Sequence, residues 1–171
     1  MLSTLVLLAD SDGPPASLGA LVRTLGALVP GTIEGLVRDV TIVAAGPDPE
    51  VGRVADHAGC ALVDGPGFER AMAAALAGLR APITLLLRAG AHVDRDFRDE
   101  VARALSEAAG GVSLLLREVP TGLAGRVLPG LAPIAGLVAP ARMLRPARSF
   151  NDLVKQAGKA RTLTARAVMV A

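Results

Sequence analysis

Short apolar runs alternate with longer helical segments along this chain, and that alternation limits the folds open to it. The first run, LSTLVLLA at 2–9, shows no period-two polarity, as expected for a strand that is buried on both faces. A turn with two aspartates and two prolines follows. Apolar residues from Leu18 to Val29 then recur at three- and four-residue spacing, which predicts an amphipathic helix.

The same order repeats at least three more times. We expect strands at 40–45, 60–63, 83–87 and 112–117, and helices at 50–58, 68–79 and 94–109. Beyond them we expect a strand at 135–139, a helix near 151–157 and a last strand near 165–170. This order predicts an α/β sandwich with a mainly parallel central sheet and right-handed crossovers. Ligands of such sheets bind at the carboxyl ends of strands, here the loops that begin at Asp10, Ala44, Asp64 and Arg88.

Composition restricts the class of protein further. The 171 residues suit one domain, and a hydrophobic fraction of 51% excludes a disordered chain. The chain has no Trp, no Tyr and three Phe, so it lacks a platform on which single-stranded bases could stack. A nucleic-acid partner is therefore not expected.

The charge is unevenly distributed along the chain. Residues 1–118 carry a net charge of −5, whereas residues 119–171 carry +7. Such asymmetry suggests an anionic partner for the basic part, and a plain solvated face explains it equally well. Arg142, Arg145 and Arg148 recur every third position beside the uncharged stretch 127–141, which suggests contact with an anionic membrane surface or with a protein.

Cysteine usage and the chain start bear on the compartment. The single Cys60 excludes an intramolecular disulfide and a multi-cysteine zinc site, and we expect it to be a buried, inert thiol. His57 is expected to be exposed on a polar helix face. The first ten residues lack a basic region, and the longest uncharged stretch is too short to span a membrane. These features predict a cytoplasmic protein and leave peripheral contact with the inner membrane open.

Several nucleotide-binding motifs are missing. No glycine-rich fingerprint follows the first strand, and no Gly-Lys-Ser/Thr triplet occurs, which argues against a nicotinamide enzyme and a Walker-type loop. Asp10, Asp12 and Asp64 resemble the acidic residues of a phospho-receiver domain. However, Arg88 stands where a small hydroxyl residue is expected, and Asp10 and Asp12 can equally cap the first helix.

A resemblance to a known family covers most of the chain. The segments LVLLADSDGPPASLGALVRTLGALVP, EGLVRDVTIVAAGPDPEVGRVADHAGCALVDGPGFERAMAAALAGLRAP and ITLLLRAGAHVDRDF resemble the family 2 glycosyltransferases, above all their small bacterial branch. The segment Gly136-Leu137-Val138 is similar to a later Gly-Leu-Phe segment of that family. The resemblance implies a GT-A fold and a nucleotide-sugar donor linked to UDP or GDP. It also implies a single GT-A-like domain over 1–171, with a nucleotide-binding part at 1–118 and a shortened basic acceptor part at 119–171.

The chain departs from the family where the chemistry lies. The uracil-binding aspartate is replaced by Ala44 or Ala45, and the metal-binding Asp-x-Asp motif by Arg88-Ala89-Gly90. The catalytic base would fall near Ile134 or Ala135. No catalytic residue can therefore be named, and a divalent metal is not expected.

Other residues could still bind the donor. Arg70 falls where the branch carries an arginine near the nucleotide, and Arg88 could pair with a diphosphate directly. The full set expected at the nucleotide is Asp10, Asp12, Gly46, Arg70, Arg88 and Gly90. A displaced metal site on His92, Asp94 and Asp96 is an alternative. Equally, Asp94 could cap the helix that follows, with Asp96 as a favourable first-turn charge.

Three functions stay open from the sequence. The chain could be an atypical, metal-independent glycosyltransferase. It could be a catalytically impaired relative that binds a nucleotide or a partner. Its basic part could bind an anionic surface. The missing carboxylates favour the second interpretation.

Overall fold

We describe residues 1–8, 16–108, 111–120 and 132–170 of a computed structural model of the chain. The strands are β1 (Leu2–Leu7), β2 (Val37–Ala44), β3 (Ala61–Asp64), β4 (Ile83–Arg88), β5 (Ala91–His92), β6 (Leu114–Glu118), β7 (Ile134–Pro140) and β8 (Arg161–Met169). The helices are α1 (Leu18–Ile33), α2 (Pro49–Ala58), α3 (Phe68–Ala77), α4 (Arg95–Glu107) and α6 (Phe150–Gln156), with a 3₁₀ turn, η2, at Ala141–Met143. The expected elements are thus all present, and β5 is an additional short strand.

The strands form a sheet in the order β3-β2-β1-β4-β7-β6-β8-β5. The first four strands in this order are mutually parallel, as are β6 and β8. Strand β7 runs antiparallel to both of its neighbours, and β5 runs antiparallel to β8. The expectation of a mainly parallel sheet is therefore confirmed. The apolar run at 135–139 did not predict the direction of β7, because direction depends on which strands pair.

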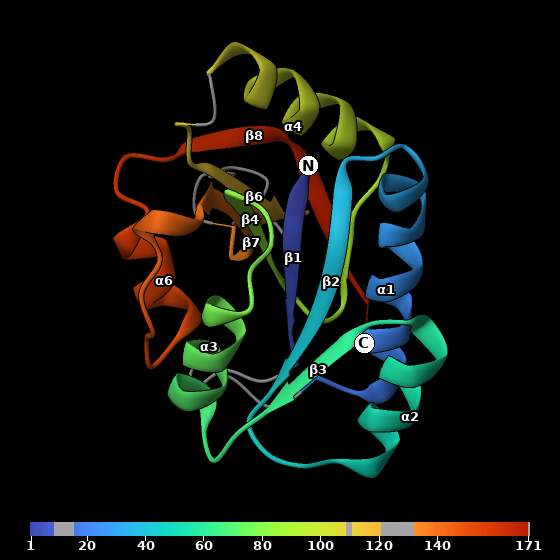
Figure 1. The fold of residues 1–171 in the computed structure, drawn as a ribbon. Coiled ribbons are helices and arrows are strands. Elements are labelled where there is room, and N and C mark those ends of the chain that lie inside the picture. Colours follow the sequence, from blue (N-terminus) through green and yellow to red (C-terminus); the bar gives the residue numbers. More distant parts are fainter. Residues whose placement is uncertain (9–15, 109–110, 121–131, 171) are drawn as a thin grey trace.

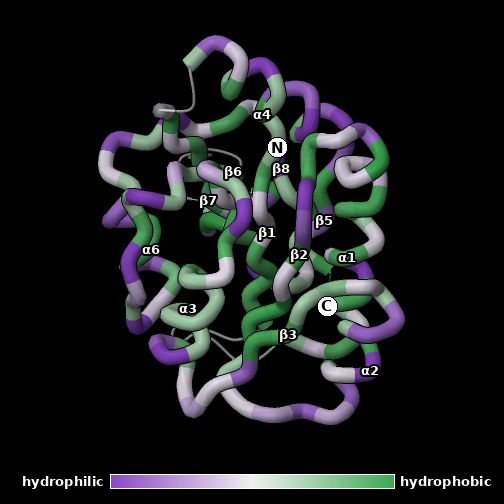
Figure 2. Tube along the Cα trace, in the orientation of Figure 1, coloured by the Kyte–Doolittle hydropathy of each residue, from purple (hydrophilic) through white to green (hydrophobic). Residues whose placement is uncertain are grey.

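Helices cover both faces of the sheet, as expected (Figure 1). On one face, α1, α2 and α4 pack over a core that includes Leu21, Val51 and Phe97. On the other face, α3 and α6 contribute Phe68 and Phe150. All three phenylalanines of the chain are thus buried, two of them on the face of α3 and α6. In Figure 2 the hydrophobic stretches run through the interior strands, and hydrophilic positions gather at the periphery.

The observed bounds differ from the expected ones at three elements. Helix α1 continues through Pro30 to Ile33, three residues beyond a proline that could have ended it. Strand β2 begins at Val37, because Leu2 pairs with it, although the polar pair Arg38-Asp39 hides this start in the sequence. Strand β8 begins at Arg161 rather than near 165, since polar residues alternate along this partly exposed strand.

Side chains at the helix starts satisfy free backbone N–H groups. Ser17, Asp48, Asp94 and Ser149 each accept a hydrogen bond from the first turn of their helix. The cap that the sequence predicts at Asp94 is therefore present. None of the helices described here has the length and apolar character needed to cross a bilayer.

Candidate functional site

The carboxyl ends of five strands meet along one edge of the sheet, which we call the carboxyl edge. Leu7 at the end of β1 pairs with Val43 of β2 and with Arg88 of β4. Ala44 at the end of β2 pairs with Asp64 of β3. Since β7 is antiparallel to both β4 and β6, the last residue of β6, Glu118, lies at the same edge. Parallel α/β sheets bind ligands at such an edge.

A cleft of about 570 Å³ opens beside the ends of β2 and β3. We call it the strand-end cleft; its walls come from the β2 and β3 loops, the start of α3 and the segment before α6 (Ala45, Pro66, Gly67, Phe68, Glu69, Arg70 and Arg148). The N–H groups of Gly65 and Gly67 donate to the carbonyls of Ala44 and Ala45, which joins the two loops. The cleft therefore has a hydrogen-bonded wall and two arginines.

The cleft brings together residues that are distant in sequence. Arg70 is exposed in the first turns of α3, as a binding arginine must be. The Nε atom of Arg148 lies 3.6 Å from Oε2 of Glu69 in an exposed ion pair. The basic C-terminal part thus contributes to the nucleotide-binding part, which the charge distribution alone could not show.

Arg88 and Glu118 lie at the ends of β4 and β6, and both are half-buried. Burial raises the pKa of Glu118, and the positive charge of Arg88 opposes that rise. A half-buried carboxylate within the field of a guanidinium is a common arrangement in binding and catalytic sites. Sequence reasoning missed Glu118; the signal was the charged pair that ends the apolar run of β6.

The two expected binding glycines differ in their surroundings. Gly46 lies in the turn after β2, and no atom stands within 4 Å of the position that a Cβ would take. Gly90 has a φ of 96° and donates its N–H to Oγ1 of Thr24 at 2.8 Å. A Cβ at Gly90 would lie 2.9 Å from the carbonyl oxygen of Val170. The N–H of Gly90 is thus engaged within the fold, whereas Gly46 leaves room for a ligand.

The expected acidic residues have separate fates. Asp10 and Asp12 lie outside the described residues. His92, Asp94 and Asp96 are exposed, and Oδ1 of Asp94 accepts the N–H of Phe97 at 3.0 Å. Within the described ranges, no three His, Cys, Asp or Glu side chains gather in a way that could hold a metal ion. Asp94 therefore acts as the helix cap that the sequence offered as the alternative to a metal ligand.

The arginine row of the basic part is exposed but irregular. Arg142 lies in η2, and Arg145 and Arg148 follow it in an extended segment whose Leu144 and Ala147 are buried. The Nη1 atom of Arg145 donates to the carbonyls of Arg142 and Leu144. The three-residue spacing thus comes from a turn and an extended segment.

Comparisons with known proteins identify the fold. No family model matches the sequence, and no curated protein matches it either. Among solved structures, glucosyl-3-phosphoglycerate synthase from Mycobacterium tuberculosis with phosphoglyceric acid is similar, with a TM-score of 0.65 and 15% identity over 99% of this chain and 72% of that one. The same synthase with Mn²⁺, UDP and glucosyl-3-phosphoglycerate gives a TM-score of 0.64 at 14% identity, over 99% and 72% of the two chains.

A third structure, described as a mycobacterial protein, gives a TM-score of 0.56 at 16% identity, over 84% of this chain and 54% of that one. At such low identity the similarity concerns the fold. The chain has a GT-A-like glycosyltransferase fold, as the sequence resemblance implied.

Proposed function

We propose that this chain is a glycosyltransferase-like protein that binds a nucleotide sugar, or the nucleoside diphosphate part of one, with little or no sugar transfer. The observation that carries the proposal is Arg88, the last residue of β4, at the carboxyl edge of a GT-A-like sheet. A guanidinium can pair bidentately with phosphate oxygens, so Arg88 can offset diphosphate charge without a metal.

Other residues of the edge support a nucleotide site. Arg70 is exposed in the strand-end cleft, where it can reach an anionic ligand. Gly46 leaves open space at the end of β2, where a flat base could approach the backbone. Asp10 and Asp12 follow β1 in sequence and remain part of the proposed site. Gly90 contributes by shape, because its N–H is already donated to Thr24.

The residues present do not fit the Mn²⁺ that accompanies UDP in solved structures of the mycobacterial synthase. The end of β4 carries an arginine, and hard divalent cations need oxygen ligands. In the described part of the chain no cluster of three candidate ligands exists. We therefore propose metal-independent nucleotide binding.

Impaired catalysis follows from the same side chains. A transferase must stabilise the charge that develops on its leaving diphosphate, and it commonly needs a base at the acceptor hydroxyl. The structure offers Glu118 at the edge, and burial raises the pKa of this group while Arg88 faces it. One carboxylate in the field of an arginine is a poor substitute for separate metal ligands and base.

Titration calorimetry with UDP and GDP, with Mn²⁺ or with EDTA, tests the proposal. We expect binding that is unchanged by EDTA and weakened about tenfold or more in Arg88→Ala, since a charge-assisted hydrogen bond contributes about 1.5–3 kcal/mol. The matched control is Arg53→Ala, which removes an exposed arginine from α2. Absence of binding to both nucleotides, or binding that requires Mn²⁺ and ignores Arg88→Ala, would contradict the proposal.

A turnover assay tests the impaired chemistry separately. We expect no sugar release from UDP- or GDP-linked donors above the buffer rate, with or without Mn²⁺. Turnover at ordinary enzyme rates, about 1 per second or faster, would overturn that part and leave nucleotide binding standing.

The alternative is a partner-binding module, possible for any GT-A-like chain that lacks nucleotide affinity. The exposed guanidinium groups of Arg142, Arg145 and Arg148 support it, because they form a cationic strip on one segment. Nucleotide binding in calorimetry would rank this alternative second.

A further inference from the structure

Two arginines sit side by side on strands β6 and β8, away from Arg88. Arg117 of β6 is in register with Arg166 of β8, and the two strands are parallel. Registered residues of parallel strands project from the same face of a sheet, and neighbouring strands lie about 4.8 Å apart. The two guanidinium groups therefore leave the sheet next to each other.

Their neighbours tell which face this is. Leu116 and Ala167, adjacent to the arginines in sequence, are buried in the core under α1, α2 and α4. Because side chains alternate along a strand, Arg117 and Arg166 project from the opposite face. Both residues are half-buried there.

The fold leaves part of this pair without acceptors. The Nη1 atom of Arg117 donates to the carbonyl oxygen of Ala132 at 2.6 Å. By contrast, Nε of Arg117 and Nη1 of Arg166 are buried with no hydrogen-bond partner. Neither guanidinium forms an ion pair among the described residues. Two adjacent positive charges with unsatisfied buried donors are costly, and one bound anion would relieve both costs.

We propose that Arg117 and Arg166 bind the phosphate group of a ligand. A phosphomonoester carries up to two negative charges and three acceptor oxygens, so it can accept from both guanidinium groups at once. A carboxylate has two oxygens and one charge, and one arginine alone can satisfy it. The source of the phosphate is a small phosphorylated molecule or a lipid headgroup, since both present the same chemistry.

This site is separate from the proposed nucleotide site. Strand β7 lies between β4 and β6, so about 10 Å of sheet separates the backbone of Arg88 from that of Arg117. The phosphate site does not rest on nucleotide binding and can exist in a chain that binds no nucleotide.

The first test measures phosphate binding to the full chain. Calorimetry and thermal unfolding are followed with inorganic phosphate and methyl phosphate, against chloride at equal ionic strength. We expect a dissociation constant of about 1 mM and an unfolding temperature that rises with phosphate concentration. In Arg166→Gln we expect at least a tenfold loss of affinity and no phosphate-dependent rise. Arg53→Gln, with the same charge change on α2, should behave as wild type.

The unfolding data also separate binding from folding. In chloride, Arg166→Gln should be at least as stable as wild type, because it removes like-charge repulsion and an unsatisfied donor. Arg117→Gln is the second variant, with the same loss of phosphate binding. Phosphate affinity that is unchanged in both variants would overturn the proposal.

Vesicles distinguish the two sources. Flotation with vesicles of phosphatidylglycerol and phosphatidylcholine, against phosphatidylcholine alone, should depend on Arg166 if a lipid headgroup is the ligand. Phosphate binding without flotation identifies a small phosphorylated molecule. No binding to either probe would overturn the site. Loss of UDP binding in Arg166→Gln would show instead that the pair belongs to the nucleotide site, while UDP binding lost only in Arg88→Ala keeps the two sites distinct.

Discussion

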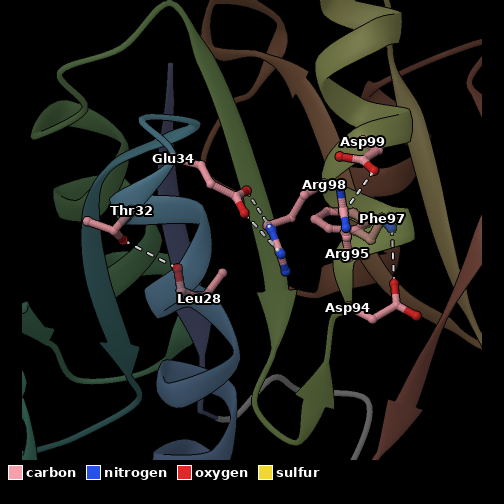
Figure 3. Close-up of polar contacts among 8 residues, drawn as sticks. All are labelled: Leu28, Thr32, Glu34, Asp94, Arg95, Phe97, Arg98 and Asp99. Atoms are coloured by element: carbon pink, nitrogen blue, oxygen red, sulfur yellow. Dashed lines mark hydrogen bonds and ion pairs between the residues drawn. The ribbon is translucent and has the colours of Figure 1, made fainter.

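At the scale of single residues, several side chains near the expected chemistry serve the fold. Asp94, close after the altered metal motif, caps α4 by accepting the N–H of Phe97 (Figure 3). Gly90 adopts a positive φ and packs against the carbonyl of Val170. His57 is exposed as expected. Cys60 is half-buried just before β3, and burial raises the pKa of its thiol, which agrees with an unreactive group.

The cap at Asp94 leads to a prediction. Asp94→Ala should lower the free energy of unfolding by about 1 kcal/mol, because the first turn of α4 loses its side-chain acceptor. Asp96→Ala is the matched control: it removes a first-turn carboxylate that makes no cap hydrogen bond, and should cost about 0.3 kcal/mol. Urea denaturation measures both. A stabilisation by Mn²⁺ in wild type that Asp94→Ala abolishes would instead indicate a metal ligand.

At the scale of elements, an antiparallel strand joins two parallel groups. Strand β7 lies between β4 and β6, and its Gly136 sits where the strands come closest. A Cβ there would lie 2.7 Å from Cδ2 of Leu87 and 3.0 Å from the carbonyl oxygen of Leu86. Glycine at this position thus allows the backbone of β7 to approach the β4 side chains.

We expect Gly136→Ala to lower the free energy of unfolding by about 1–3 kcal/mol, through overpacking of the β4–β7 contact. Gly52→Ala in α2 is the matched control, since no atom lies within 4 Å of its Cβ position. It should raise stability by about 0.5–1 kcal/mol, because alanine favours helix over glycine. Chemical denaturation of both variants checks the pair, and equal stabilities would refute the packing argument.

A second feature at this scale explains the irregular start of β8. The pairing of β6 with β8 shifts register between Leu115 and Arg117, which frees backbone N–H groups of β8. Glu100 of α4 accepts the N–H groups of Thr164 and Ala165 at 2.9–3.0 Å. A helix side chain thus satisfies donors that the sheet leaves unpaired.

At the scale of the whole molecule, α1 and α4 are joined by a bidentate ion pair (Figure 3). Nε and Nη2 of Arg98 donate to the Glu34 carboxylate at 2.8 and 3.1 Å. Hydrogen bonding from Arg98 holds the pKa of Glu34 below its usual value. At Glu100, burial works against ionisation, yet the backbone N–H groups of Ala165 and Thr164 and the charge of Arg161 keep its pKa lowered as well.

These shifts predict the pH dependence of unfolding. A carboxylate whose folded-state pKa is lowered stabilises the fold at pH above its unfolded value of 4.5, and the contribution disappears as pH falls through the folded-state pKa. Glu34→Gln should therefore be less stable than wild type at neutral pH and converge with it in acid. The control is Glu107→Gln, at the exposed end of α4. Parallel stability curves for Glu34→Gln and wild type would contradict the assignment.

The local pattern of the sequence determined the elements and the caps. Apolar runs and three-and-four spacing predict β1, β4 and α4, and Asp94 marks a helix start, because these signals depend on neighbours within one or two turns. The resemblance to family 2 glycosyltransferases added the GT-A fold, which the solved structures support. The placement of Arg70 beside the β2 loop also agrees with the expected side of the sheet.

Tertiary structure alone decided which distant residues meet. Strand pairing set β7 antiparallel, brought Glu118 into the field of Arg88 and aligned Arg117 with Arg166. Register and direction are non-local: a strand's apolar run states that it is buried, and only its partners state beside what. The candidate anion sites therefore became visible once the order of the strands was known.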